Sequence, residues 1–279
     1  MRRLVFPFVF SVVWLVCFGC HDKPAPAPAD KPRLVTLSPS ATEIVAALGA
    51  TAMLVGVDDY SKFPPEVAKL PKVGSFLTPN LERIVALKPT LVIVDDVHKP
   101  AAGALRDAGL QTIECPIHSL PDVKKALASV GAKLGKADEA KRIGDDIEAA
   151  LDRAAQARPA KRPRVLAILD REAGGLGNLV AAGPGSWLDE LLAVVGGENV
   201  LAASGVRYPK LSMEEVLRAQ PDIILDASYA GRASTKEWTQ IDVPATKAGK
   251  VVVLADDFMI APSPRVQQAL ATMTRALTP

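Results

Sequence analysis

One ten-residue pattern occurs in both halves of this chain and constrains its fold more than any other feature. The first copy, residues 80–89, reads NLERIVALKP, and the second, residues 212–221, reads SMEEVLRAQP. In each copy a helix-capping residue opens the segment, a glutamate follows two positions later, and a proline ends the helix. An apolar strand pattern comes next, at residues 91–93 and 223–225. The chain is therefore predicted to contain two units of similar construction.

A second, weaker match supports this duplication. Residues 42–49 (TEIVAALG) align with residues 189–196 (DELLAVVG), and each segment precedes the stronger repeat in its own half. A helix cap followed by a proline is common, so either match alone has little weight. Two matches in the same order favour a duplicated, two-lobed architecture over coincidence.

Segments with strand and helix patterns alternate on both sides of a helical middle region. Residues 137–157 contain no proline and are expected to form one long helix. The alternation elsewhere is typical of parallel sheets covered by helices. The expected strands are 33–37, 53–57, 91–95, 111–115, 164–170, 222–226 and 251–255, and the other expected helices are 40–48, 80–87, 101–108, 187–195, 212–219 and one from about residue 264.

We therefore predict an α/β protein of two Rossmann-like lobes with parallel sheets, joined by one long rigid helix. The N-terminal lobe is expected to span residues 33–136, the linking helix residues 137–158 and the C-terminal lobe residues 159–279. Ligands of open α/β sheets bind at the carboxyl ends of the strands. A ligand cleft is accordingly expected between the lobes.

The N-terminus has the pattern of a cleaved secretory signal. Arg2 and Arg3 precede an apolar run from Leu4 to Gly19, which is shorter than the roughly 20 residues that a membrane-spanning helix needs. An uncleaved anchor helix is the alternative. The run ends Gly19-Cys20, so residues 1–19 are predicted to be a signal peptide and Cys20 an acylated first residue of the mature chain.

Residues 20–32 are predicted to be a tether between this lipid anchor and the folded part. The segment His21–Pro32 is rich in proline and alanine, which favour an extended polyproline conformation. At about 3.1 Å per residue it reaches roughly 35 Å. Cys115 is then the one cysteine left for the fold, so no intramolecular disulfide is expected.

Charge and motifs argue against several function classes. The net charge is +2, and removal of residues 1–19, which carry Arg2 and Arg3, leaves 31 basic and 31 acidic side chains. Nucleic-acid binding is not expected from such a balance.

The sequence contains no G-x-S-x-G or P-loop motif, and its three histidines, His21, His98 and His118, lack metal-ligand spacing. We expect no cofactor, no metal site and no catalytic residues. The acidic pairs 58–59, 95–96 and 256–257 are expected to be solvated loop residues.

Aromatic side chains stand at expected loops near the cleft, although aromatics make up only 5% of the chain. Packing alone would explain any single one of them. Together they predict a cleft lined by flat apolar faces, suited to a large ligand that also carries polar groups. The residues concerned are Tyr60, Phe63, Phe76, Tyr208 and Phe258.

Several of these segments resemble a known family. The segment RLVTLSPSATEIVAALGATAMLVGVDD (residues 33–59), YSKFPP (60–65) and NLERIVALKPTLVIV (80–94) are similar to class III periplasmic binding proteins of ABC importers. In the second half the similar pieces are GGENV (196–200), residues 208–217 and SPR (263–265). Cobalamin-binding members are the most similar, and siderophore- and haem-binding members are more distant.

The resemblance implies a rigid inter-lobe helix, little closure on binding, and a glutamate on each lobe that contacts arginines of a dimeric permease. Glu82 and Glu214 match the two glutamates. Among the cleft positions of the cobalamin-binding members, Tyr60 and Asp257 match the family's tyrosine and aspartate. Three positions that carry tryptophan in those members are occupied here by Phe76, Tyr208 and Asp95, and Ala261 replaces an arginine. Phe258 follows Asp257 as a further candidate contact.

The sequence thus predicts a monomeric substrate-binding lipoprotein on the periplasmic side of the cell envelope. It would capture cobalamin and deliver it to a permease dimer with its ATPase subunits. An iron-siderophore or haem is the alternative ligand. An envelope enzyme or an interaction scaffold are the other function classes. An enzyme would need a nucleophile, a metal or an acid–base pair, which the sequence does not display. A scaffold would not need aromatic residues in the cleft on both lobes.

Overall fold

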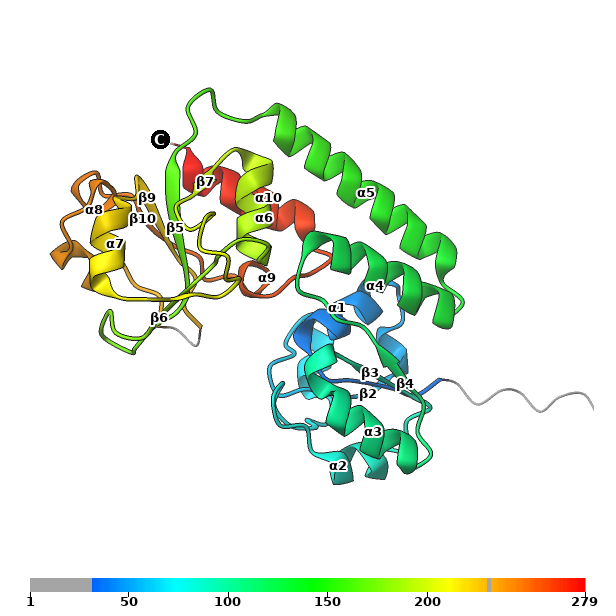
Figure 1. Ribbon diagram of the computed structural model, residues 1–279. Helices are drawn as coiled ribbons and strands as arrows, with labels where there is room; N and C mark the ends of the chain where they lie inside the picture. Colours follow the sequence, from blue (N-terminus) through cyan, green and yellow to red (C-terminus); the bar gives the residue numbers. More distant parts are fainter. Residues whose placement is uncertain (1–31, 230–231, 279) are drawn as a thin grey trace, which may run out of the picture. The chain divides into compact units, whose positions relative to one another are not determined.

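The computed structural model describes residues 32–229 and 232–278, and its two sheets belong to one compact unit (Figure 1). The predictions made for residues 1–31, namely the signal peptide, the acylated Cys20 and most of the tether, lie outside the described residues. None of the described helices is both long and apolar enough to cross a membrane.

The first sheet has four strands in the order β2-β1-β3-β4, and all of them are parallel. Its central strands are runs of branched apolar residues that are buried throughout, as expected for a parallel sheet covered by helices. The strands are β1 (Leu34–Thr36), β2 (Leu54–Val57), β3 (Leu91–Val94) and β4 (Thr112–Glu114).

Side-chain caps begin three of the helices of this lobe. Ser38, Asn80 and Ser119 each accept a hydrogen bond from a backbone N–H of the first turn. The helices are α1 (Pro39–Ala47), α2 (Leu81–Ala86), α3 (Lys99–Asp107) and α4 (Leu120–Lys133), with 3₁₀ turns η1 (Thr51–Met53), η2 (Pro65–Lys69) and η3 (Asp96–His98).

The second sheet has the order β10-β9-β5-β6-β8, and β7 also pairs with β5. The strands expected from the sequence, β5, β9 and β10, are parallel, whereas β6 runs antiparallel to both β5 and β8. The sheet is therefore mixed. Its strands are β5 (Arg164–Asp170), β6 (Leu179–Ala181), β7 (Glu198–Asn199), β8 (Lys210–Leu211), β9 (Ile223–Asp226) and β10 (Val251–Val253).

The helices of the second lobe include the second copy of the repeat. Ser212 caps α7 and, with Glu215, forms a capping box, and Gly196 ends α6 in the left-handed conformation. The helices are α6 (Trp187–Val195), α7 (Met213–Ala219), α8 (Pro244–Lys247), α9 (Asp257–Ile260) and α10 (Val266–Leu277), with a 3₁₀ turn η4 (Glu237–Gln240).

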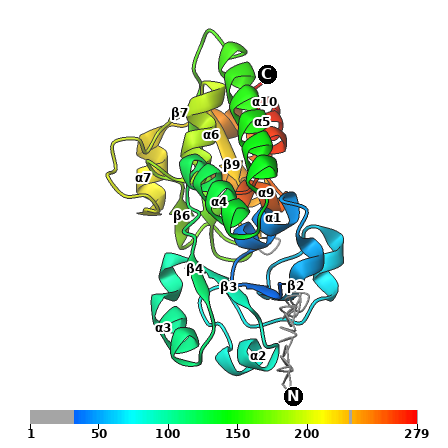
Figure 2. The same cartoon turned by 90° about the vertical axis from the view of Figure 1, so that its right-hand side faces the viewer.

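Helix α5 (Ala137–Gln156) connects the two lobes (Figure 2). Its 20 residues correspond to roughly 30 Å of helix. One face packs against α4 of the first lobe and against α6 and α10 of the second. Ile147 lies in a core cluster that contains residues of both lobes. The predicted two-lobed α/β fold with a long connecting helix is confirmed.

Side chains also join the lobes directly. Glu43 of α1 accepts hydrogen bonds from Arg265 Nε, at 2.8 Å, and from Ser263 Oγ. The Arg265 guanidinium carbon lies 4.1 Å from the ring centre of Phe63 and 4.9 Å from that of Phe258. A buried charge pair and two cation–π contacts therefore meet where the lobes touch.

Candidate functional site

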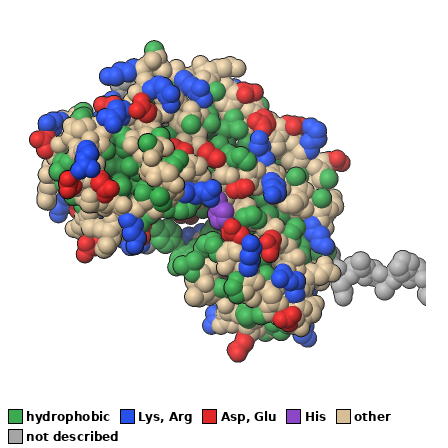
Figure 3. All heavy atoms as spheres, in the orientation of Figure 1, with side chains coloured by type: hydrophobic (Ala, Val, Ile, Leu, Met, Phe, Trp, Pro, Cys, Tyr) green, Lys and Arg blue, Asp and Glu red, His purple; other side chains and the backbone are tan. Residues whose placement is uncertain are grey.

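A pocket of about 420 Å³ lies at the carboxyl ends of the first sheet and is lined on the other side by residues of the second lobe. Apolar side chains gather on both sides of the hollow between the lobes in Figure 3. A volume of this size is typical of ligand sites. The lining residues are Ser38, Pro39, Ser40, Tyr60, Ser75, Phe76, Leu77, Asp95, Ile117, His118, Tyr229, Ile260, Ala261 and Pro262.

A second pocket of about 490 Å³ adjoins the first and shares Tyr60, Tyr229 and Ile260 with it. Tyr60 follows β2 and Tyr229 follows β9, so the two tyrosines come from different lobes. Their ring centres are 5.4 Å apart and the rings meet edge to face at 84°. The two pockets together form a cleft that both lobes line, with this tyrosine pair at its middle.

A buried polar network holds Tyr60 in place. The Asp58 carboxylate, 1% exposed, accepts hydrogen bonds from Tyr60 N at 2.9 Å and from Ser61 Oγ. Burial raises the pKa of Asp58, although these hydrogen bonds oppose the shift. Thr42 Oγ1 and Lys72 Nζ contact Ser61 in turn, each at 2.7 Å. The loop after β2 is therefore fixed by interactions beneath it.

An acidic cluster with one histidine forms part of the pocket wall. His118 Nε2 lies 3.2 Å from Asp95 Oδ1 and 3.1 Å from Asp96 Oδ1. Hydrogen bonding to Asp95 raises the pKa of His118 to about 9. Burial alone would raise the pKa of Asp95, but the hydrogen bonds from His118 and its other neighbours lower it to about 2. At neutral pH the His118 imidazolium therefore pairs with the Asp95 carboxylate.

The structure places four of the six predicted contact residues in the cleft. Tyr60, Phe76 and Asp95 line the first pocket, and Asp257 lines the second. Phe258 and Tyr208 are not among the lining residues of either. The Phe258 ring packs against the core and Arg265, and the Tyr208 side chain is 46% exposed. A contact between any of the six residues and a ligand stays a prediction.

Sequence reasoning missed two residues of the site and the burial of two others. His118 and Tyr229 each follow a strand, β4 and β9, so the carboxyl-end rule would have found both. Asp95 was expected to be solvated, but only 3% of it is exposed because residues of the loop after β4 cover it. Asp58 is buried as well, at 1% exposure. The expectation of solvated acidic pairs is wrong for the first member of these two pairs.

The predicted docking glutamates occupy equivalent places in the two lobes. Glu82 and Glu214 are exposed at the second position of α2 and α7. Asn80 Oδ1 and Ser212 Oγ cap the two helices in the same way. Glu214 pairs with Arg218 at 2.8 Å on the surface of its own helix.

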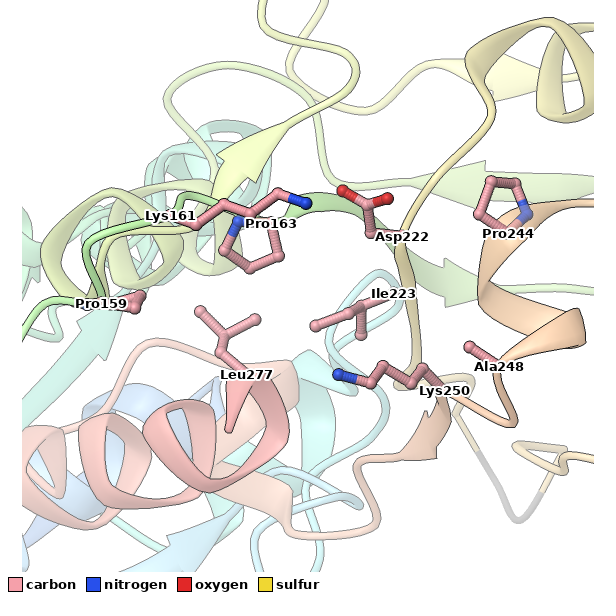
Figure 4. A pocket seen from close by; sticks show the side chains of 9 residues that line it. All are labelled: Pro159, Lys161, Pro163, Asp222, Ile223, Pro244, Ala248, Lys250 and Leu277. Atoms are coloured by element: carbon pink, nitrogen blue, oxygen red, sulfur yellow. The ribbon is translucent and has the colours of Figure 1, made fainter. Parts of the chain in front are cut away.

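Another pocket, of about 400 Å³, lies at the opposite, amino end of the second sheet (Figure 4). Pro163, Asp222 and Lys250 on its wall immediately precede β5, β9 and β10. Asp222 accepts a hydrogen bond from Arg164 N at 2.9 Å, which joins two strand ends. Ligands of open sheets bind at the carboxyl ends, so the cleft is the stronger candidate site.

Comparison with known families agrees with this geometry. The sequence pattern of the periplasmic binding protein family matches residues 34–258 of this chain. This chain belongs to the periplasmic binding protein family. The family match covers both lobes, the connecting helix and most of the residues that line the cleft.

Individual members are similar along nearly the whole folded part. The vitamin B12-binding protein of Salmonella typhimurium is 34% identical over 255 residues, which are 88% of this chain and 90% of that protein. The solved periplasmic heme-binding protein from Roseiflexus sp. RS-1 is 30% identical, with a TM-score of 0.79 over 88% of this chain and 97% of that one. The periplasmic vitamin B12 binding protein of Vibrio cholerae is 27% identical, with a TM-score of 0.71 over 88% and 96%.

Proposed function

We propose that this periplasmic binding protein is the substrate-binding lipoprotein of an ABC importer and that its ligand is cobalamin. The observation that carries the proposal is the cleft lined from both lobes, with Tyr60 and Tyr229 in contact at its middle. Relatives that cover 88% of this chain are vitamin B12-binding proteins. The family description and these names describe binding rather than catalysis.

The chemistry of the cleft suits a corrinoid. Aromatic faces at Tyr60, Phe76 and Tyr229 match a broad flat ring. A corrin ring also carries amide side chains, whose N–H groups are donors for carboxylates such as Asp95 and Asp257. Among the described residues that line the two pockets, Lys62 is the one lysine or arginine, so the two carboxylates of haem would find a single cationic partner.

Haem is the second candidate, and a specific observation favours it. A tyrosine hydroxyl is one of the protein ligands that haem iron accepts, and Tyr60 and Tyr229 both line the pocket. The heme-binding protein from Roseiflexus also has the higher TM-score of the two solved relatives compared above. The two ligands therefore have to be compared directly.

Parallel calorimetric titrations with cobalamin and with haemin make this comparison. We expect one cobalamin site per chain, and Tyr60→Ala or Tyr229→Ala should weaken it about fivefold or more, since a lost aromatic contact costs about 1 kcal/mol or more. Val85→Ala, at an exposed position of α2, is the control and should bind like the wild type. Binding of haemin without cobalamin would assign the alternative, and binding of neither would refute both.

The proposal includes membrane anchoring through Cys20, which follows the apolar run of residues 4–19. Several acyl chains hold a protein on a bilayer far better than one. Cys20→Ala should therefore move the protein from the membrane fraction to the soluble fraction of fractionated cells. A wild-type protein that is already soluble would contradict the anchor.

A further inference from the structure

We infer that Asp95, Asp96 and His118 form a binding site for a divalent transition-metal ion in the wall of the cleft. The three side chains come from the ends of two strands, β3 and β4, and meet only in the folded chain. One imidazole nitrogen and two carboxylate oxygens are donors that Zn²⁺ and its first-row neighbours accept. The inference does not depend on which ligand the cleft binds.

The spacing of the donor atoms fits one shared ion. Nε2 of His118 lies 3.2 Å from Asp95 Oδ1 and 3.1 Å from Asp96 Oδ1, and all three atoms lie within 4.8 Å of one another. Two atoms bound at about 2.1 Å to one tetrahedral ion are about 3.4 Å apart, close to the 3.2 and 3.1 Å between His118 Nε2 and the two carboxylate oxygens. An ion can therefore enter with little movement of the side chains.

Asp95 is the buried member of the cluster, and one of its carboxylate oxygens is poorly hydrogen-bonded. His118 Nε2 is hydrogen-bonded to Asp96 Oδ1, and Asp95 Oδ2 accepts one from Ile117 N at 3.4 Å. Asp95 Oδ1 faces His118 Nε2 at 3.2 Å as an ion pair but makes no well-aligned hydrogen bond among the described residues, and only 3% of Asp95 is exposed. Because a buried carboxylate needs a cation or a well-aligned donor, a metal ion bound by both Asp95 Oδ1 and His118 Nε2 would take the place of this ion pair.

The surrounding structure holds the donors in position. The backbone N–H of Asp95 donates to His98 Nδ1 at 2.9 Å, and the buried His98 is fixed through its Nε2 by the carbonyl oxygen of Phe76. On the other strand, the backbone N–H of His118 donates to Asp122 Oδ2 at 3.2 Å. These contacts fix the backbone that carries Asp95 and His118 and so limit where their side chains can lie. The ion would replace the proton that now lies between His118 and the carboxylates.

The site would be open on the side of the cleft. Asp95 and His118 line the pocket, so an ion held by them would contact whatever the pocket contains. Three protein ligands leave at least one coordination position free. A donor atom of the bound ligand, or water, would fill it.

Titration of the metal-stripped full chain with CoCl₂, followed by absorption spectroscopy, and with ZnCl₂, followed by calorimetry, tests the inference. We expect one equivalent of either ion, with visible Co²⁺ bands of a site that contains imidazole. Asp95→Asn and His118→Gln should each weaken Zn²⁺ binding about tenfold or more. Asp59→Asn, which removes an exposed carboxylate from the neighbouring acidic pair, is the control and should bind as the wild type does.

Absence of Zn²⁺ binding to the wild type would overturn the inference and leave the cluster as an ion pair. Binding that is equally strong in Asp95→Asn and His118→Gln would overturn it too, because the ion would then sit elsewhere. Circular dichroism of each variant checks the fold. If one of the two variants misfolds, the other still tests the site. Cobalamin binding is measured in a separate titration, so the metal site and the proposed cobalamin binding are tested independently of each other.

Discussion

Arg171 and Asp226 show how a single buried residue pair organises the second lobe at the carboxyl ends of β5 and β9. Both are almost fully buried, with Arg171 Nε at 2.9 Å from Asp226 Oδ2. The indole N–H of Trp238 donates to the same oxygen at 3.0 Å, and Glu237 pairs with the other side of the guanidinium at 3.2 Å. Every member is paired, which is the condition for burying charge.

Removal of the Asp226 carboxylate should therefore be costly. Asp226→Ala leaves the Arg171 guanidinium buried without its main partner, and we expect the free energy of unfolding to fall by about 3–5 kcal/mol in urea titrations. Lys141→Ala breaks an exposed pair with Asp145 at 2.6 Å and serves as the comparison. Its cost should stay below about 1 kcal/mol. Equal costs for the two variants would mean that burial does not matter here.

The elements that join the lobes are α5 and the segment that ends in Arg265. Helix α5 packs on α4, α6 and α10 and so fixes one side of the junction. On the other side, Arg265 contacts Glu43 in α1, Phe63 in the loop after β2 and Phe258 in α9. Two segments of the first lobe and α9 of the second therefore meet at one guanidinium.

Arg265→Ala is expected to lower the free energy of unfolding by about 3 kcal/mol or more, because Glu43 stays buried with one partner fewer. The double variant with Glu43→Ala should cost less than the sum of the single variants, which a double-mutant cycle measures. Arg275→Ala, at an exposed position of α10, should change stability by less than about 0.5 kcal/mol. If the cost of the double variant equals the sum of the two single costs, the contact between Arg265 and Glu43 does not stabilise the junction.

At the scale of the whole molecule, the duplicated sequence places α2 and α7 at equivalent positions of the two lobes. Each exposes a glutamate, Glu82 or Glu214, in its first turn. Helix stabilisation by a carboxylate at this position, about 0.3–1 kcal/mol, accounts for an acidic residue there. It does not account for two such residues on matching helices of two lobes. A permease dimer with two equivalent cationic pockets would use both, because pairs of arginine with carboxylate are strong and directional.

Reversal of both charges tests this docking proposal. Glu82→Arg with Glu214→Arg should abolish ligand uptake by cells while the affinity of the purified protein for its ligand stays nearly unchanged. Glu66→Arg with Glu198→Arg makes the same charge change at two other exposed glutamates and should leave transport intact. Transport that survives the first double reversal, or affinity that falls in step with transport, would exclude these residues as docking contacts.

The sequence by itself determined the two lobes, the long helix α5 and the main parallel strands. These follow from local patterns: helical periodicity, caps such as Asn80 and Ser212, and apolar runs bounded by proline and glycine. Tyr60 was predicted at the cleft because it follows a strand, and Phe76 because it lies in a loop before a helix. Asp95 was a candidate through the family resemblance alone.

Only the tertiary structure decided which residues meet. Strands β6, β7 and β8 contain two or three residues each, too few for a pattern, and they exist because β5 and β6 supply hydrogen-bond partners. Asp95 is buried, and close to His118, because β3 and β4 are neighbours in the sheet. Local propensity is encoded within a few residues of the chain. Burial and charge pairing depend on strand order, which brings together residues that are far apart in sequence.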